Sequence, residues 1–359
     1  MRSALIISRA DAEFGYGHLS RMLTLARFLR NERGFTVSTL LLGDEKSLAF
    51  ARDRGETVLF FPSWELKFAI RRTLLRELLN EKYPLHKDHP SVIIFDVYDF
   101  FDTFWGRGLF KKMFPLSSFI GLDIYHTRLR DERVERKNYQ PVEFKCIINS
   151  LLSPIGMGES EQAGIRILYG TDFLILPPEI FEVAKWNYND QLRKVTVFLG
   201  GGEVKYLLRL TRELSSSAFK EYEFQVFTGR AEAQTVPISA NVHLRPLCEQ
   251  TVFLRELSTS RFAIVSAGQT LYEVAHLGVP AVVIPVVPHQ LSTAHKLSER
   301  GFGVCVRPRP AGFGASLKSA IQKLEDKDFL MAQSRAGMAL VDGKGIYRVS
   351  EVIESLVEE

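Results

Sequence analysis

The stretch Phe14-Gly-Tyr-Gly-His-Leu-Ser-Arg21 decides the fold of the first half of this chain. An apolar run from Ala4 to Ile7 precedes it and predicts a buried parallel strand. After it, apolar residues recur at the three- and four-residue spacing of an amphipathic helix. Gly15, Gly17 and His18 therefore fall in the turn between a first strand and a first helix. In open α/β sheets, ligands bind at such turns.

The residue types in this turn indicate a functional site. Two glycines let the backbone bend tightly and let a ligand approach closely. His18 is the side chain in the turn that is suited to moving a proton near neutral pH. From these residues alone, two alternatives stay open, because a lone Gly-x-Gly pair is weak evidence. The turn is either a structural one in which His18 caps the helix, or a dinucleotide phosphate loop.

The composition is that of a soluble globular protein. The chain has 359 residues, which favours two domains, with 46% hydrophobic and 25% charged residues. The net charge of +4, with acids and bases mixed, does not point to nucleic acid. It is compatible with anionic small ligands or a weak attraction to an acidic membrane.

We expect a cytoplasmic protein that contacts a membrane at most peripherally. Three scattered cysteines form neither a disulfide framework nor a metal site, which indicates a reducing compartment. The first ten residues lack a signal-peptide pattern, and no apolar run reaches the ~18 residues of a membrane span.

Polar residues follow three further predicted strands of the first half. Val92 to Phe95 leads into Asp96-Val-Tyr98, and two later strands end at Asp123 and Asn149. An acid, a phenol and an amide at the carboxyl ends of parallel strands suit substrate hydroxyls or amides. The alternative for Asp96 is an N-cap of the following helix. Asp96, Tyr98 and Asn149 are our candidate substrate-binding residues.

Four other segments have a simpler prediction. A basic amphipathic helix is predicted over 64–83, as a surface helix or a membrane contact. The aromatic stretch 98–114 is core or, in part, an exposed patch for a lipid or a partner. A loop is predicted over Gly156–Gly164. The polar segment Lys185–Arg193 is the candidate linker between two domains.

The pattern of strands and helices starts again at Val195. A strand ending at Leu199 leads into Gly200-Gly-Gly202 and a helix, and a strand ending at Ser266 leads into Gly268-Gln-Thr270 and another helix. Strand–helix alternation therefore occurs twice. This predicts an α/β fold of two doubly wound, Rossmann-like domains that face each other across a cleft.

The two glycine turns of the second half have the chemistry of a diphosphate cradle. Both leave backbone N–H groups free at a helix start, and the second adds an amide and a hydroxyl. Glu273, one helical turn later, suits ribose hydroxyls. No P-loop sequence is present, which disfavours phosphoryl transfer from ATP. No metal site and no cofactor are expected. The candidate nucleotide-binding residues are Gly200, Gly201, Gly202, Gly268, Gln269, Thr270 and Glu273.

Longer motifs carry a resemblance to a known family. They are Arg9-Ala-Asp11, Gly15 to Arg21, Ser266-Ala-Gly-Gln-Thr-Leu-Tyr-Glu273, Gly278-Val-Pro280, His289-Gln290 and Val341-Asp-Gly-Lys-Gly345. Together they resemble the UDP-sugar hydrolases of the pseudaminic acid pathway and the related spore coat polysaccharide biosynthesis proteins. The second half is also similar, more distantly, to the glycosyltransferase that makes the lipid intermediate of peptidoglycan. These families share the two-domain GT-B fold.

The resemblance implies how the chain is divided. Residues 1–184 would form the N-terminal Rossmann-like domain, which holds the sugar or acceptor. Residues 194–345 would form the C-terminal nucleotide-binding domain, and the helix 346–359 would pack back on the first. His18 would be catalytic, with Gly15, Gly17 and Arg21 near the sugar. Gln290 would join the nucleotide site, and no metal would be required.

The leading expectation is a hydrolase of a UDP-linked sugar. Water attack at the anomeric carbon, with His18 as general base, would release UDP and a free, modified deoxyamino sugar for surface-polysaccharide synthesis. The alternative is a GT-B glycosyltransferase that moves the sugar to a glycan or lipid acceptor. A third reading is a nucleotide-sugar binding protein without catalysis.

Overall fold

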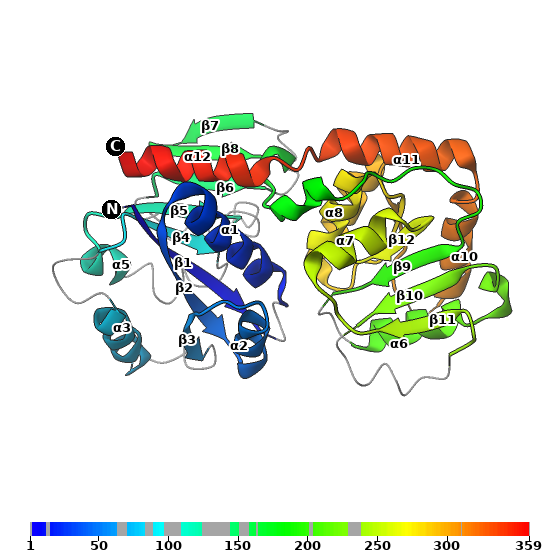
Figure 1. The fold of residues 1–359 in the computed structure, drawn as a ribbon, viewed down its shortest axis with the longest axis horizontal. Helices are drawn as coiled ribbons and strands as arrows, with labels where there is room; N and C mark the ends of the chain where they lie inside the picture. Colours follow the sequence, from blue (N-terminus) through cyan, green and yellow to red (C-terminus); the bar gives the residue numbers. More distant parts are fainter. Residues whose placement is uncertain are drawn as a thin grey trace. The chain divides into compact units, whose positions relative to one another are not determined.

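The chain divides into two compact units in the computed structural model (Figure 1). Unit 1 comprises Met1–Ile175 and Lys344–Glu359, and unit 2 comprises Leu176–Gly343. The structure describes residues 2–11, 15–62, 70–82, 89–96, 109–123, 144–150, 158–162, 164–200, 204–228, 238–309 and 311–358. Tyr98, Gly201 and Gly202 lie outside these ranges.

Within the described ranges, the sheet of unit 1 has eight strands in the order β3-β2-β1-β4-β5-β6-β8-β7. All neighbours are parallel except β7 and β8. The strands are β1 (Ser3–Ala10), β2 (Thr36–Gly43), β3 (Leu59–Pro62), β4 (Val92–Asp96), β5 (Ser118–Leu122), β6 (Cys146–Asn149), β7 (Gly158–Gln162) and β8 (Ile165–Tyr169). The near-continuous apolar runs in β1 and β4 fit strands that are covered on both faces.

The helices of unit 1 begin and end at local signals. α1 ends before Gly34, which adopts the left-handed conformation typical of a helix stop (φ 67°). α2 begins with a capping box, in which Asp44 and Ser47 bond each other's backbone N–H groups. The helices are α1 (Gly17–Arg33), α2 (Glu45–Arg52), α3 (Ile70–Lys82), α5 (Leu109–Met113) and α12 (Gly345–Glu358), with a short 3-10 turn η3 (Thr171–Phe173).

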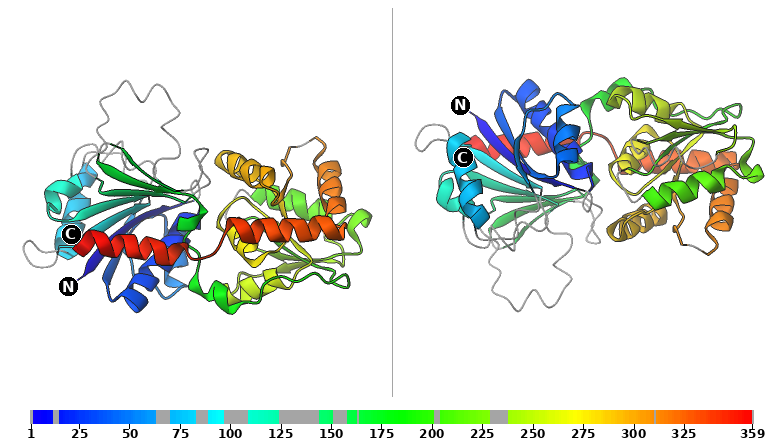
Figure 2. Two further views of the ribbon diagram at one scale, coloured as in Figure 1. Left: turned by 90° about the horizontal axis from the view of Figure 1, so that it is seen from above. Right: turned by 90° about the horizontal axis from the view of Figure 1, so that it is seen from below.

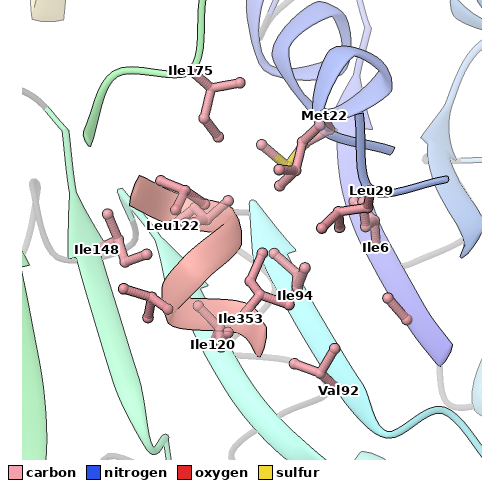
Figure 3. Packing of buried hydrophobic residues seen from close by; sticks show 14 of the residues in the cluster. Ile6, Met22, Leu29, Val92, Ile94, Ile120, Leu122, Ile148, Ile175 and Ile353 are labelled. Atoms are coloured by element: carbon pink, nitrogen blue, oxygen red, sulfur yellow. The ribbon is translucent and has the colours of Figure 1, made fainter. Parts of the chain in front are cut away.

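One face of this sheet is covered by α1 and by α12, the last helix of the chain (Figures 1 and 2). Buried residues of both helices, such as Met22 and Ile353, pack on strand residues such as Ile6 and Ile94 (Figure 3). An ion pair of 2.7 Å between Arg2 and Glu354 adds to the contact. Each buried aliphatic side chain contributes roughly 1.5–3 kcal/mol, so α12 is an integral part of unit 1.

The opposite face of the sheet packs on α3 and α5. Phe110 and Phe114 are fully buried there against Phe95, with ring centroids of Phe95 and Phe110 5.4 Å apart. This end of the aromatic segment is therefore core. The rest of that segment, 98–108, lies outside the described residues.

Unit 2 has a parallel sheet with six strands in its described part, in the order β11-β10-β9-β12-β13-β14. The strands are β9 (Lys194–Phe198), β10 (Glu223–Phe227), β11 (Val242–Arg245), β12 (Phe262–Val265), β13 (Ala281–Val283) and β14 (Val304–Cys305). The helices are α6 (Val204–Leu214), α7 (Gln250–Ser258), α8 (Gln269–Leu277), α9 (Pro288–Glu299), α10 (Phe313–Lys323) and α11 (Lys327–Leu340), with 3-10 turns η4 (Pro178–Glu182) and η5 (Ser217–Phe219).

Both units have the Rossmann strand order. The first six strands of each follow the pattern 3-2-1-4-5-6, counted from the start of the unit. In such sheets the order reverses between strands 1 and 4, and ligands bind outside the carboxyl ends of the strands at that point. The corresponding places are the ends of β1 and β4 in unit 1 and of β9 and β12 in unit 2.

The chain passes between the units at 175–176 and again at 343–344. The second passage uses two glycines. Gly343 has φ 79°, and a Cβ there would lie 2.5 Å from the His276 ring. A Cβ at Gly345 would overlap the backbone of Leu174. The motif Val341–Gly345 therefore needs its glycines because the chain is tightly packed at this passage.

Two predicted segments differ in the structure. The expected loop at Gly156–Gly164 contains β7, whose polar, exposed sequence gives no hydrophobic alternation because it is an edge strand. The expected linker at Lys185–Arg193 is packed on unit 2, where Trp186 is buried and its Nε1–H donates to the Ser260 carbonyl at 2.8 Å. The helix predicted over 64–83 is α3 in its described part, Ile70–Lys82, and the other residues of that prediction lie outside the described residues. In the described part of the chain, every helix is too short or too polar to cross a bilayer.

Candidate functional site

The turn that carries His18 joins β1 to α1. Gly15 has φ 75°, a conformation that favours glycine, and its N–H donates to the Asp11 carbonyl at 2.8 Å. Tyr16 is the N-cap residue, and no side chain caps the helix. His18 lies within the first turn of α1, so the expectation that it merely caps the helix is wrong.

Gly17 has no comparable structural reason to be glycine. Its φ is not positive, and no described atom lies within 4 Å of the position that a Cβ would take. A glycine in a helix is less stable than alanine by up to about 1 kcal/mol. The absence of a side chain at Gly17 therefore fits close approach of a ligand to the backbone.

His18 is paired with the acid that ends β4. Its Nδ1 atom lies 2.8 Å from Asp96 Oδ1. The carboxylate is almost fully buried, with 1% of its side chain exposed, whereas 19% of the His18 side chain is exposed. Asp96 lies opposite Ser8 in the sheet, so the pair forms where β1 and β4 are neighbours.

Arg21, one turn further along α1, contacts the same carboxylate. Its Nε donates to Asp96 Oδ2 at 3.0 Å and its Nη2 to Asp96 Oδ1 at 2.5 Å. The Nη2 atom is also 2.9 Å from His18 Nδ1. Its Nη1 donates to Asp123, directly after β5. The guanidinium thus bridges two buried carboxylates that end adjacent strands.

Asp123 is held from two sides. Besides Arg21, its carboxylate accepts hydrogen bonds from the backbone N–H and the hydroxyl of Ser150, at 2.6 and 2.8 Å. Ser150 directly follows β6, so the network extends over the ends of β4, β5 and β6. Asp123 has φ 50° and is the one non-glycine residue with positive φ in the described part of the chain.

Asp96 is ionised at every physiological pH. Burial is the largest influence and by itself would raise the pKa of the Asp96 carboxyl. The charges of Arg21 and His18, with their hydrogen bonds, outweigh it and lower the pKa to about 2. In the tautomer whose Nδ1–H donates to this carboxylate, the imidazole is oriented by Asp96 and Nε2 is the ring nitrogen for proton transfer. The arrangement can remove a proton from a hydroxyl group or from water.

The second candidate site is formed by the glycine turns of unit 2. Ser266 follows β12, and a Cβ on either Gly200 or Gly268 would lie within 3.7 Å of its hydroxyl. Gln290 lies next to them, with its Nε2 3.6 Å from a Cβ at Gly268. Gly200 has φ 68°. The turns that follow β9 and β12 therefore meet at the point where the strand order of unit 2 reverses.

The start of α8 is suited to an anion. Gly268 is its N-cap, no side chain caps the helix, and its first turn contains no acid. Free N–H groups and the helix dipole favour negative charge at such an end. On the neighbouring helix, the Gln290 Oε1 atom accepts the Val286 N–H at 2.9 Å, which fixes that side chain beside the turn.

Glu273 is buried one turn inside α8, with 4% of the residue exposed. Its Oε1 accepts a hydrogen bond of 3.0 Å from Gln250 Nε2 on α7, and Thr270 also donates to it. Burial raises the pKa of the Glu273 carboxyl to about 7, against these two hydrogen bonds. The carboxyl group changes charge near neutral pH.

Among the residues that the structure describes, no group of three His, Cys, Asp or Glu side chains is arranged to hold a metal ion.

The sequence of this chain is similar to those of known proteins. No protein-family model matches it. It is 26% identical to the spore coat polysaccharide biosynthesis protein SpsG of Bacillus subtilis, over 99% of this chain and 98% of SpsG. A shorter match, 29% identical over 142 residues, covers 37% of this chain. The matched protein is the UDP-N-acetylglucosamine–N-acetylmuramyl-(pentapeptide) pyrophosphoryl-undecaprenol N-acetylglucosamine transferase of Aquifex aeolicus, and the match covers 41% of its length.

Solved structures give the fold. MurG of Acinetobacter baumannii superposes with a TM-score of 0.64, at 16% identity, over 99% of this chain and 100% of that one. The spinosyn rhamnosyltransferase SpnG, complexed with thymidine diphosphate, gives 0.63 at 18% identity over 98% and 100%. The fold is GT-B. The resemblance to the spore coat family and its fold, which the sequence motifs predicted, is confirmed.

The GT-B chain brings together some of the predicted residues. His18, Arg21 and Asp96 form one network, and Gly200, Gly268 and Gln290 form another. Asn149 ends β6, and its neighbour Ser150 donates a hydrogen bond to Asp123. Gln269 and Thr270 lie in the first turn of α8.

Sequence reasoning left Asp123, Ser150 and Ser266 out of the site. Each directly follows a strand, which is the signal that pointed to Asp96 and Asn149. Asp123 and Ser266 were visible as strand ends, but polar strand ends are common. Only the contacts of Arg21 with Asp123 and of Ser266 with the glycine turns distinguish them.

Proposed function

We propose that this GT-B protein is a glycosyltransferase of polysaccharide biosynthesis. It moves a sugar from a nucleoside diphosphate sugar to a hydroxyl group of a glycan or lipid acceptor. The observation that carries the proposal is the pairing of His18 with the buried, ionised Asp96 at the strand-order reversal of unit 1. An oriented imidazole at that place is a general base for a hydroxyl nucleophile.

The reaction is a single displacement at the anomeric carbon. Nε2 of His18 accepts the proton of the acceptor hydroxyl while its oxygen bonds to the anomeric carbon. The bond from that carbon to the diphosphate oxygen breaks, and the nucleoside diphosphate leaves with the electron pair. His18 then returns the proton to solvent. Such a displacement inverts the anomeric configuration.

The glycine turns of unit 2 would stabilise the leaving group. The uncapped start of α8 and the turn at Gly200 offer N–H groups to a diphosphate, with Ser266 and Gln290 beside them. Glu273 would accept hydrogen bonds from ribose hydroxyls in place of those from Gln250 and Thr270. This division of roles supports a nucleotide-sugar as the substrate.

Transfer is supported better than hydrolysis. The same imidazole would activate water, and the sequence motifs favoured a UDP-sugar hydrolase. The named relatives, however, include a UDP-N-acetylglucosamine transferase and a rhamnosyltransferase with thymidine diphosphate, and no named relative is a hydrolase. We therefore propose glycosyl transfer as the main activity, with UDP or dTDP as the nucleoside diphosphate of the donor sugar.

The test is an assay of nucleoside diphosphate release. UDP-, dTDP-, GDP- and CMP-linked sugars are each incubated with the full chain, with and without simple alkyl glycosides and lipid-linked sugars as hydroxyl acceptors. Release that requires an acceptor, with a glycosylated product by mass spectrometry, is expected. Release of free sugar at the same rate without any acceptor would instead support the hydrolase. Nucleotide binding without turnover would support the binding protein.

A further inference from the structure

We propose that an open cavity on unit 2 is a saccharide-binding site, separate from both candidate sites described above. The cavity has a volume of about 580 Å³ and is lined by the segment 184–192 and by Ser258 and Thr259 at the end of α7. The segment contains most of the stretch that the sequence predicted to be a linker. The proposed function supplies only the source of the saccharide, a glycan acceptor or product, and the site itself is argued from its own residues.

The cavity lies at the amino edge of the unit 2 sheet. The segment 184–192 leads into β9, and Ser258 and Thr259 precede β12. The glycine turns of the candidate nucleotide site follow the same two strands at their carboxyl ends. A ligand in the cavity is therefore separated from the nucleotide turns by the length of the strands, and the two sites can be occupied together.

The segment 184–192 is fixed to unit 2, so the cavity is preformed. Trp186 is buried, and its backbone N–H donates to the Leu277 carbonyl at 2.8 Å. The neighbouring Lys185 Nζ donates to the His276 carbonyl at 2.7 Å. Both carbonyls belong to the last turn of α8, where helical hydrogen bonds run out and other donors are needed. Because the segment is held in place, a ligand does not have to order it on binding.

The lining combines the groups that a saccharide needs. Tyr188 contributes an aromatic ring, which is held by an edge contact with Trp186. Asn187 and Asn189 contribute amides, and Asp190 contributes a carboxylate. An aromatic ring packs on the C–H face of a sugar, while amides and carboxylates bond its hydroxyl groups. Tyrosine and asparagine also combine rigid contact area with adaptable hydrogen bonding in other recognition surfaces.

Much of this hydrogen-bonding capacity is unused within the part of the chain that the structure describes. The Asn187 side chain is exposed and makes no hydrogen bond there. Asn189 Oδ1 accepts the Gln191 N–H at 2.9 Å, which leaves the Nδ2 donors of its amide for a ligand. The Asp190 carboxylate has one long contact, 3.4 Å from its Oδ1 to Gln191 Nε2. Ligand hydroxyl groups therefore find both donors and acceptors in the lining.

The charges of the lining favour an uncharged ligand. Its charged side chains are Lys185 and Asp190, one of each sign. The Lys185 ammonium already donates to the His276 carbonyl. An anionic ligand would have to compete for that ammonium and would face the Asp190 carboxylate, whereas hydroxyl groups can bond either one. The chemistry therefore fits a neutral saccharide better than a phosphate or a nucleotide.

The decisive experiment is saccharide binding to the full chain, measured by saturation-transfer NMR and calorimetry. The neutral probes are maltotriose, triacetylchitotriose and methyl rhamnoside, and trigalacturonate is the anionic comparison. We expect at least one neutral probe to bind, and trigalacturonate to bind more weakly. Tighter binding of the anionic probe would overturn the assignment to a neutral saccharide.

Two variants of the lining locate the bound saccharide. Asn187→Ala should weaken its affinity by about fivefold, the usual effect of one neutral hydrogen bond. It should keep the wild-type melting temperature, because the side chain is exposed. Tyr188→Ala removes the ring and should abolish detectable binding. Gln191→Ala is the matched control, since Gln191 is exposed in the same segment but does not line the cavity, and it should bind like wild type.

The outcomes separate this proposal from the proposed function. Equal binding by wild type, Asn187→Ala and Tyr188→Ala would show that the saccharide binds elsewhere, and absence of binding by every neutral probe would also overturn the site. Neither result affects the proposed function, because Asn187→Ala should release nucleoside diphosphate at the wild-type rate with alkyl glycoside acceptors. Failure of every nucleotide-sugar to react would overturn the proposed function, but binding that is weakened in Asn187→Ala would still establish the saccharide site.

Discussion

The Nδ1 atom of His18 lies 2.8 Å from the Oδ1 atom of Asp96, a residue 78 positions later in the chain. The contact exists because β1 and β4 are neighbours in the sheet: Asp96 ends β4, and His18 lies in the first turn of α1, the helix that follows β1. The Rossmann strand order places this contact where such sheets bind their ligands. The chemistry proposed for this protein depends on it.

Replacing the base should remove catalysis and spare nucleotide binding. We expect His18→Ala to lower kcat by ~10² or more, the usual contribution of a general base. UDP or dTDP affinity, measured by calorimetry, should stay within about twofold because the nucleotide residues belong to unit 2. A variant that loses affinity but keeps kcat at saturation would show that our roles for the two units are reversed.

Asp96→Asn should affect both activity and stability. The amide keeps the shape but cannot hold the imidazole in the same tautomer, so kcat should fall by ~10² to 10⁴. Arg21 also loses the partner of its fork, and breaking a buried ion pair costs about 3–5 kcal/mol of unfolding free energy. Activity and chemical denaturation are measured at pH 7.5. Unchanged turnover would contradict the orienting role of Asp96.

Alanine substitutions at the two glycines near His18 should have opposite effects on stability. Gly15→Ala forces a side chain into φ 75° and should cost about 1–2 kcal/mol of stability. Gly17→Ala meets no described atom within 4 Å and should leave stability unchanged or raise it by up to about 1 kcal/mol. If Gly17 makes room for a ligand, KM rises in this stable variant. Wild-type kinetics for Gly17→Ala would remove that role.

Glu273 predicts a pH dependence of stability. The pKa of its carboxyl in the fold is about 7, above the ordinary 4.5, so the folded state holds this proton more tightly than the unfolded state. Its favourable contribution is therefore complete below pH 4.5 and is lost as the pH rises to about 7. Glu273→Gln stays neutral, so its advantage over wild type should grow from pH 5 to 7 and then level off.

Thermal unfolding of both proteins at pH 5, 6, 7 and 8 checks this course. The same variant tests the ribose role, because an amide accepts hydrogen bonds less well than a carboxylate and also donates them. We expect weaker nucleotide binding at pH 8 in Glu273→Gln by calorimetry. Equal affinity with the expected stability curve would leave Glu273 as a structural residue only.

Local signals in the sequence predicted most elements of the fold. Such signals depend on neighbouring residues in the sequence, so they can be recognised without knowledge of tertiary contacts. They include the apolar runs of β1 and β4, the glycine that ends α1 and the new start of strand–helix alternation at Val195. β7 was missed because an exposed edge strand has no hydrophobic pattern. The passage between units was expected near Lys185–Arg193 because that segment is polar, whereas Trp186 binds it to unit 2.

The candidate site, like the fold, could be predicted only in part from local sequence. Polar residues at strand ends and glycines before helices made His18, Asp96 and Gly268 candidates, since a parallel sheet brings its carboxyl ends to one edge. Their partners could not be predicted. Arg21 was assigned to the sugar, and only the positions of Asp96 and Asp123 show that its guanidinium is held by protein.

The sequence by itself determined two Rossmann-like α/β halves, their strand and helix periods, and a histidine near the end of the first strand that is suited to proton transfer, because these depend on residue type, local pattern and backbone freedom. The tertiary structure alone decided which carboxylate His18 faces, that Arg21 stands between two acids, and that Ser266 joins the two glycine turns. Those facts depend on strand order and on contacts between residues far apart in the chain. The burial of Asp96 and its proximity to Arg21 and His18 set the pKa of its carboxyl, and both arise only once the sheet has formed.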